Sequence, residues 1–326
     1  MTEPAAEVYY DPYDFEIDAD PYPVFRRLRD EAPLYRNEVL DFYAVSRFAD
    51  VEACSIDWET FSSRRGTVLE LIRSEWNIPR GMFIFEDPPI HNLHRRLMGR
   101  VFTAKRVAVL EEEMRSYCAA VLDPVRGAGG FDFVRDLGAD LPMRVISKML
   151  GIPDEDSEAV RDHFDTALRI DEGGPPSAGN TVGTTEMSRF AEYIAYRRTH
   201  PSDDLMTDLL ETTFTDEVGV ERHLHDEEIL NYALLLAGAG NETTTKLIGW
   251  TGYLLGMHPD QRRLLVDDPS LIPGAIEEIL RYEAPSPVQA RYVQKDAALH
   301  GTAPPPSAAP SDIARCSSSK DAGTRT

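Results

Sequence analysis

Residues 234–245 read Leu234-Leu235-Leu236-Ala237-Gly238-Ala239-Gly240-Asn241-Glu242-Thr243-Thr244-Thr245, and this stretch decides the fold. It lies within a pattern of apolar residues from Asp226 to Met257 that has the spacing of a helix buried on most of its circumference. Acidic residues begin the pattern and His258-Pro259 ends it. A helix of this length spans about 45–50 Å, enough to cross a whole domain.

The middle of this predicted helix has an unusual composition. Gly238 and Gly240 each disfavour a helix by about 1 kcal/mol relative to alanine. The three threonines that follow can donate hydrogen bonds to carbonyls one turn earlier and bend the helix. Small residues permit close approach, so two interpretations stay open from this stretch alone: a close helix–helix crossing, or a flat ligand beside Glu242 and Thr243.

A second motif follows two prolines, Pro88 and Pro89, which favour the start of a helix. His91 and Arg95 are four residues apart and therefore share a helix face, which suits a carboxylate or a phosphate. A solvated basic face is the plainer alternative. His91 with His94 could form a metal pair, but no third ligand follows at a suitable spacing, so we predict no protein-ligated metal.

A third motif places Glu278 and Arg281 three residues apart in a helix predicted over 271–282. By itself such a pair is commonplace and contributes little to stability. Ser286-Pro287-Val288 and then Arg291 follow it. The order of the three motifs carries more information than any one of them.

In this order, over residues 20–300, the motifs resemble those of bacterial cytochrome P450 monooxygenases. Residues 239–244 are similar to the small-Gly-x-acid-Thr-Thr run of the helix that passes over the haem face. Residues 87–96 are similar to the helix whose His and Arg clamp a haem propionate. The predicted opening of helix, strands 34–36 and 42–45, and helix is also typical of the family.

The resemblance implies a mainly α, P450-like fold with small β-sheets, and haem as cofactor. It gives Glu242 and Thr243 the delivery of protons to the oxygen that haem activates. The other implied site residues are His91, Arg95 and Arg291 at the haem propionates, Ala239 and Gly240 against the haem, and Glu278 with Arg281 as a buried structural ion pair.

The implied reaction inserts one oxygen atom from O₂ into an apolar small molecule. Electrons would come from a separate ferredoxin or flavoprotein reductase, because no dinucleotide-binding glycine fingerprint follows a predicted strand. We expect substrate choice to depend on a loop over residues 64–82 and a lid near 170–195. Neither segment carries a readable code.

The sequence departs from the family after the third motif. The family's haem ligand is a cysteine thiolate in a Phe-x-x-Gly-x-x-x-Cys loop, and this sequence has no such loop. In residues 301–326, 19 of 26 residues are Ala, Gly, Pro, Ser or Thr, a composition typical of disorder. Cys316, between Arg and Ser, is not given the ligand role.

We therefore expect an incomplete P450 domain over residues 1–300 that lacks its C-terminal part, and a tail over 301–326 produced by a shift of reading frame near His300. Loss of the thiolate predicts impaired haem binding. Two alternatives to the monooxygenase follow: an inactive remnant that at most binds apolar ligands, and an unrelated helical scaffold. The second and third motifs count against the scaffold.

Composition narrows the partners further. A net charge of −22 argues against nucleic acid and against anionic membrane surfaces. Cys54, Cys118 and Cys316 are odd in number and widely spaced, which favours neither a disulfide framework nor a zinc cluster. With no apparent leader or membrane-spanning segment, we expect a cytoplasmic protein.

Overall fold

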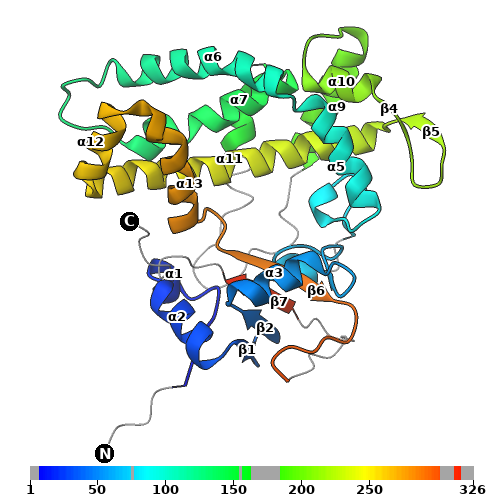
Figure 1. Ribbon diagram of the computed structural model, residues 1–326. Coiled ribbons are helices and arrows are strands. Elements are labelled where there is room, and N and C mark those ends of the chain that lie inside the picture. Colours follow the sequence, from blue (N-terminus) through cyan, green and yellow to red (C-terminus); the bar gives the residue numbers. More distant parts are fainter. Residues whose placement is uncertain (1–6, 75–76, 154–155, 163–183, 302–311, 317–326) are drawn as a thin grey trace, which may run out of the picture.

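The computed structural model describes residues 7–74, 77–153, 156–162, 184–301 and 312–316. A helical part lies above a smaller part that contains a β-sheet (Figure 1). The α-helices include α1 (Phe15–Ala19), α2 (Tyr22–Glu31), α3 (Phe48–Ile56), α4 (Leu69–Arg73), α5 (Ile90–Val101), α6 (Ala104–Leu122), α7 (Asp140–Leu150), α9 (Thr184–Thr199), α10 (Leu205–Glu211), α11 (Asp226–Met257), α12 (Pro259–Asp267) and α13 (Ile272–Tyr282).

The remaining elements are short. They are the 3₁₀-helices η1 (Phe83–Phe85) and η3 (Pro269–Leu271), the π-helix η2 (Val134–Gly138), and the strands β1 (Leu34–Asn37), β2 (Phe42–Val45), β3 (Phe61–Ser62), β4 (Thr213–Thr215), β5 (Glu221–His223), β6 (Val288–Val293) and β7 (Asp312–Cys316). In the described ranges, no helix has both the length and the apolar character needed to cross a membrane.

Helix α11 is the axis of the helical part, and its bounds are those that the sequence predicts. The backbone N–H of His225 donates to the Glu228 carboxylate at 2.9 Å, which completes a capping box at the first turn. The first half of α11 packs against α7, α9 and α10. Ile229, Tyr232 and Ala233 are fully buried there and belong to the largest hydrophobic cluster.

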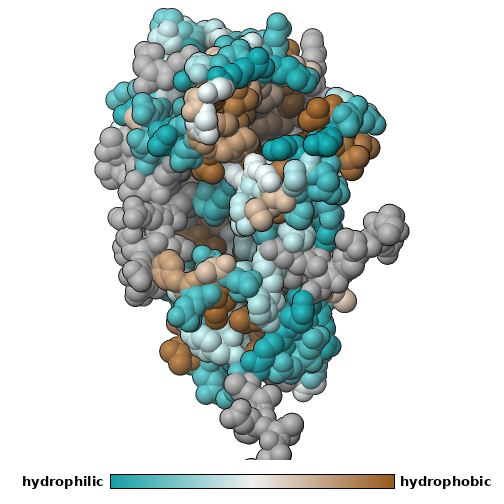
Figure 2. All heavy atoms as spheres, turned by 90° about the vertical axis from the view of Figure 1, so that its left-hand side faces the viewer, coloured by the Kyte–Doolittle hydropathy of each residue, from teal (hydrophilic) through white to brown (hydrophobic). Residues whose placement is uncertain are grey.

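The second half of α11 does not fit the prediction of a helix buried on most of its circumference. Its buried residues end at Asn241. Beyond that point η2, α12 and α13 contact the helix, yet Tyr253 and Met257 are exposed. Exposed apolar side chains continue onto α12, η3 and α13 at Leu264, Leu271 and Ile276, at the end of the molecule that faces the viewer in Figure 2.

The sheet has the strand order β1-β2-β7-β6-β3. Strands β2 and β7 are parallel and the other neighbours are antiparallel. The N-terminal segment packs on this sheet through Tyr10, whose ring contacts Phe25 and Phe42 edge-on. Strand β6 leaves α13 and enters the sheet, so it connects the helical part to the β part (Figure 1).

Strand β7 differs from the expected disorder of the tail. Its backbone pairs with both β2 and β6, with Ala314 opposite Ala44 and Ala290. Sheet pairing uses backbone groups, so a segment poor in large side chains can still complete a gap between two strands. Residues 302–311 and 317–326 of the expected tail, and the part of the expected lid over 170–183, lie outside the described residues.

Candidate functional site

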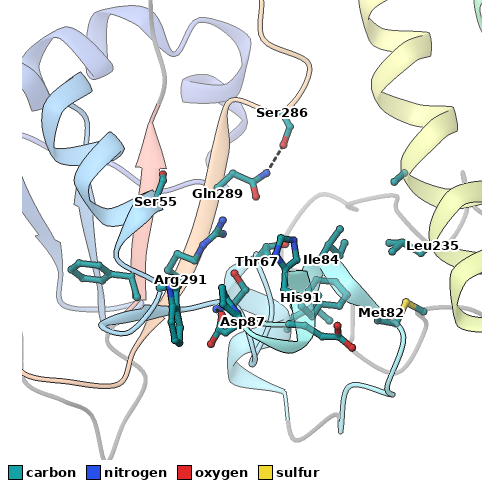
Figure 3. A pocket seen from close by; sticks show the side chains of 18 of the residues that line it. Ser55, Thr67, Met82, Ile84, Asp87, His91, Leu235, Ser286, Gln289 and Arg291 are labelled. Carbon is teal, nitrogen blue, oxygen red and sulfur yellow. Dashed lines mark hydrogen bonds between the residues drawn. The ribbon is translucent and has the colours of Figure 1, made fainter. Parts of the chain in front are cut away.

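A cavity of about 880 Å³ lies between α11 on one side and β6 with the η1–α5 segment on the other (Figure 3). A volume of this size is typical of ligand sites. Apolar and aromatic side chains make up much of its wall. They include Trp58, Phe61, Leu71, Met82, Ile84, Phe85, Leu234 and Leu235.

Helix α11 contributes its glycine-containing middle to the wall. Gly238 and Ala239 line the cavity, so nothing larger than a methyl group projects there. Leu234 and Leu235 line it one turn earlier. A flat group can therefore approach the helix backbone between these leucines and Glu242.

Glu242 and Thr243 also line the cavity, as predicted candidates for proton delivery. The Thr243 hydroxyl donates to the Ala239 carbonyl at 3.0 Å, the back-bonding that the sequence predicts. The Glu242 carboxylate pairs with Lys246 at 2.6 Å and its side chain is 38 % exposed. Adjacent residues of α11 thus place a hydroxyl in the cavity and a carboxylate that reaches solvent.

His91 and Arg291 approach the cavity from different elements. His91 stands in the first turn of α5 and Arg291 in β6, and both point into the same space in Figure 3. The His91 ring makes no hydrogen bond or ion pair within the described part of the chain. A ring donor without a partner, opposite a guanidinium, suits a ligand that carries carboxylates.

Two predicted cofactor residues do not line the cavity. Arg95 is exposed on α5. Gly240 faces α7, where a Cβ atom would lie 2.7 Å from Ile146 Cδ1. The helix-crossing interpretation is therefore the right one for Gly240, because its position on α11 is turned away from Ala239.

Glu278 and Arg281 form the predicted ion pair, with Nη2 2.6 Å from Oε1. The hydrogen bond from Arg281 holds the pKa of Glu278 below its usual value. The prediction that this pair is buried is wrong for the described structure, because the side chains are 61 % and 37 % exposed. In the described ranges, no element covers this face of α13.

The structure also reveals acidic groups that the sequence analysis missed. Asp87 is 2 % exposed and accepts from Ser62 Oγ at 2.5 Å and from the Ser63 backbone N–H at 2.9 Å. Glu86, beside it, hydrogen-bonds the buried ring of His94. Both carboxylates line the cavity. In the sequence, the only sign of this place in the cavity wall is that both residues directly precede Pro88 and Pro89.

The cavity wall includes neither Cys54 nor Cys118. Burial, together with Asp50 and Asp57, raises the pKa of Cys54 to about 12, so this cysteine is a neutral thiol. In the described ranges, no group of three or more His, Cys, Asp or Glu side chains could hold a metal ion. The cavity wall therefore carries polar side chains both on α11 and on the facing elements. Neither Cys54 nor Cys118 contributes a thiolate to it.

The sequence was compared with known proteins. No protein-family model matches it. It is 37 % identical over 304 residues to cytochrome P450 123 of Mycobacterium tuberculosis, which covers 92 % of this chain and 74 % of that protein. It is 33 % identical over 292 residues to vitamin D(3) 25-hydroxylase of Pseudonocardia autotrophica, covering 88 % and 70 %.

Solved structures give the same result. The structure of CYP109E1 from Bacillus megaterium in complex with testosterone matches with a TM-score of 0.78 and 28 % identity, over 93 % of this chain and 77 % of that one. A mutant of P450 EryK in complex with erythromycin B also has a TM-score of 0.78, at 27 % identity, over 92 % and 74 %.

These similarities show that the chain has the fold of the P450 enzymes. The chain belongs to the cytochrome P450 family, whose members are haem-dependent monooxygenases that act on small molecules with a redox partner. The predicted fold class and the predicted family are confirmed.

The described residues fit haem on two sides. Gly238 and Ala239 leave room for a flat ring against α11, and His91 and Arg291 offer donors for its two carboxylates. The opposite face of the ring needs a thiolate, and Cys54 and Cys118 do not lie in the cavity wall.

Proposed function

We propose that this chain binds haem in the cavity between α11 and β6 and serves as a monooxygenase that inserts one oxygen atom from O₂ into an apolar small molecule. The observation that carries this proposal is the convergence of Ala239, Thr243, His91 and Arg291 on one cavity. When bound, haem would supply the activation of O₂.

The chain's own residues would hold the cofactor and move protons. His91 of α5 and Arg291 of β6 would donate hydrogen bonds to the propionates from two different elements. Thr243 would accept a hydrogen bond at Oγ1 from the cavity side, because its own hydroxyl hydrogen is directed to the Ala239 carbonyl. Glu242 would exchange protons with solvent, since its carboxylate is partly exposed beside Lys246.

We also propose a substrate class. The apolar wall near α11, with Leu234, Leu235 and Phe85, would contact the substrate and exclude water. One relative is named for the hydroxylation of vitamin D(3), and solved relatives hold testosterone or erythromycin B. A large, rigid and mainly apolar substrate is consistent with that set.

The electron donor and the compartment belong to the same proposal. A separate ferredoxin or flavoprotein reductase would supply the electrons. Cys54 and Cys118 are free thiols, which suits a reducing compartment such as the cytoplasm.

A second candidate is a protein that binds haem or apolar ligands without oxygenating them. The observation that favours this candidate is that neither Cys54 nor Cys118 lies in the cavity wall, where a thiolate would be needed to ligate haem iron. The reduced, carbon-monoxide difference spectrum of the haem-reconstituted chain separates the two functions. A red-shifted, thiolate-type Soret band supports the monooxygenase, and a band of the histidine or free-haem type supports the second candidate.

A further inference from the structure

A hydrogen bond joins Glu86, in the cavity wall, to the buried ring of His94. His94 is 0 % exposed, and its Nδ1 atom lies 2.6 Å from Glu86 Oε2. The other carboxylate oxygen of Glu86 accepts from the Gly81 backbone N–H at 3.1 Å. Both oxygens of this carboxylate therefore hold the chain that leads into α5.

His94 also connects α5 to α11. The His94 ring packs edge-on against Tyr232 of α11, with 5.8 Å between ring centroids. Phe83 also packs against the Tyr232 ring, at the same centroid distance and with the two ring planes tilted by 48°. Tyr232 precedes Gly238 and Ala239 by two turns on α11, so this contact fixes the η1–α5 segment against the helix that forms the far wall of the cavity.

This polar arrangement is costly if its only purpose is packing. His94 Nε2 and the Tyr232 hydroxyl are buried and have no hydrogen-bond partner within the described part of the chain. A buried polar group without a partner lowers stability, and apolar side chains of similar size would pack here without that loss.

The position of the pair explains what it does. His91 lies three residues before His94, on the first turn of α5, and five residues after Glu86. The Glu86–His94 hydrogen bond therefore joins the two ends of the segment over 86–94, and His91 lies within this segment.

We propose that Glu86 and His94 are positioning residues that hold the His91 ring at the cavity. The proposal rests on the proposed function in one respect, namely that the anion His91 binds is a haem propionate. Neither residue needs to contact the cofactor in order to act in this way.

The test compares the full-length wild type with the double variant Glu86→Leu/His94→Leu, which replaces both polar groups by apolar ones. Glu86→Gln is the conservative variant, because its amide can accept from Gly81 and donate to His94. Asp50→Leu/His300→Leu is the matched control, since it removes another histidine–carboxylate hydrogen bond of 2.9 Å that lies in the β part.

Three quantities are measured for each protein: the midpoint of urea unfolding, the Hε1 resonance of His91 without haem, assigned with His91→Gln, and the dissociation constant for haem from a Soret titration. We expect the double leucine variant to fold, to show a shifted or broadened His91 resonance, and to bind haem about tenfold more weakly, the equivalent of one lost charged hydrogen bond. Glu86→Gln and the matched control should resemble the wild type.

An unchanged His91 resonance with unchanged haem affinity in the folded double variant overturns the proposal. Failure of the double variant to fold also overturns it, because the pair would then serve stability alone. If the wild type takes up no haem, the proposed function is wrong, and the His91 resonance by itself decides the role of Glu86 and His94.

Discussion

At the scale of single residues, the site is distinguished by which side of α11 each side chain occupies. Thr243 and Thr244 are neighbours with the same side chain, yet only Thr243 lines the cavity. Thr243 donates its hydroxyl hydrogen to the Ala239 carbonyl, so the oxygen lone pairs remain available on the cavity side. This pair of residues offers a matched comparison of a hydroxyl in the site with one outside it.

We predict that Thr243→Ala lowers product formation by the haem-loaded protein about 10²-fold, the usual size of the effect when a group positioned for proton transfer is removed. The free energy of unfolding should change by only about 0.5 kcal/mol, because the lost bond goes to a carbonyl that the helix already uses. Product yield and urea unfolding measure the two effects.

Thr244→Ala is the control and should keep the wild-type rate. Equal rates for the two alanine variants would show that Thr243 has no special part in proton delivery.

At the scale of elements, two glycines of α11 differ in how closely a neighbouring element packs against them. A Cβ atom on Gly252 would lie 2.7–3.0 Å from three ring atoms of Phe133, beside η2. A Cβ atom on Gly256 would meet nothing within 4 Å. The two positions therefore separate helix propensity from packing.

We predict that Gly256→Ala stabilises the protein by up to about 1 kcal/mol, since alanine favours a helix more than glycine does. Gly252→Ala should instead destabilise it by about 1–3 kcal/mol, because the Phe133 ring must move. Urea unfolding measures both. The packing of η2 against α11 would be looser than described if both substitutions stabilised the protein.

A cluster of charges secures the other end of α11. Arg222 of β5 donates to both carboxylate oxygens of Glu228, at 2.7 and 2.8 Å, and Arg80 Nε lies 3.3 Å from the same carboxylate. Burial alone would raise the pKa of Glu228, but the hydrogen bonds from Arg222 and from the His225 N–H outweigh it and lower this pKa. Glu228 thus stabilises the fold in its ionised form.

The direction of the pH effect follows. Because the folded-state pKa of Glu228 is depressed, its contribution is complete above the unfolded-state value of about 4.3 and is lost as the pH falls through the folded-state value. We predict that the urea midpoint of the wild type falls more steeply below about pH 4 than that of Glu228→Gln. Parallel pH profiles for the two proteins would contradict this assignment.

At the scale of the whole molecule, the sequence predicts the bounds of those helices and strands that depend on a local pattern of residues. The bounds of α11 follow from its periodicity, its acidic first turn and the proline after its end. Strands β1 and β2 were predicted within one residue, because short runs of strand-favouring residues are also a local pattern. Strands β6 and β7 were not predicted, because β6 pairs with β3 and β7 pairs with β2, in each case a segment far away in the chain.

The site was predictable in part. His91, Ala239, Glu242, Thr243 and Arg291 were identified through motif order, and all of them line one cavity. Their functional roles remain predictions. The orientation of Gly240, the exposure of the Glu278–Arg281 pair and the Glu86–His94 hydrogen bond depend on which helix lies next to each residue. No local pattern carries that information.

The most direct test of the central claim, that this cavity is a haem site, is a Soret titration of the purified 326-residue chain and of His91→Ala/Arg291→Ala. We predict saturable uptake of one haem per chain by the wild type. We expect binding weaker by about 10²-fold in the double variant, which loses one hydrogen-bond donor from α5 and one from β6. Uptake that does not saturate, or that is equally tight in both proteins, would contradict the claim.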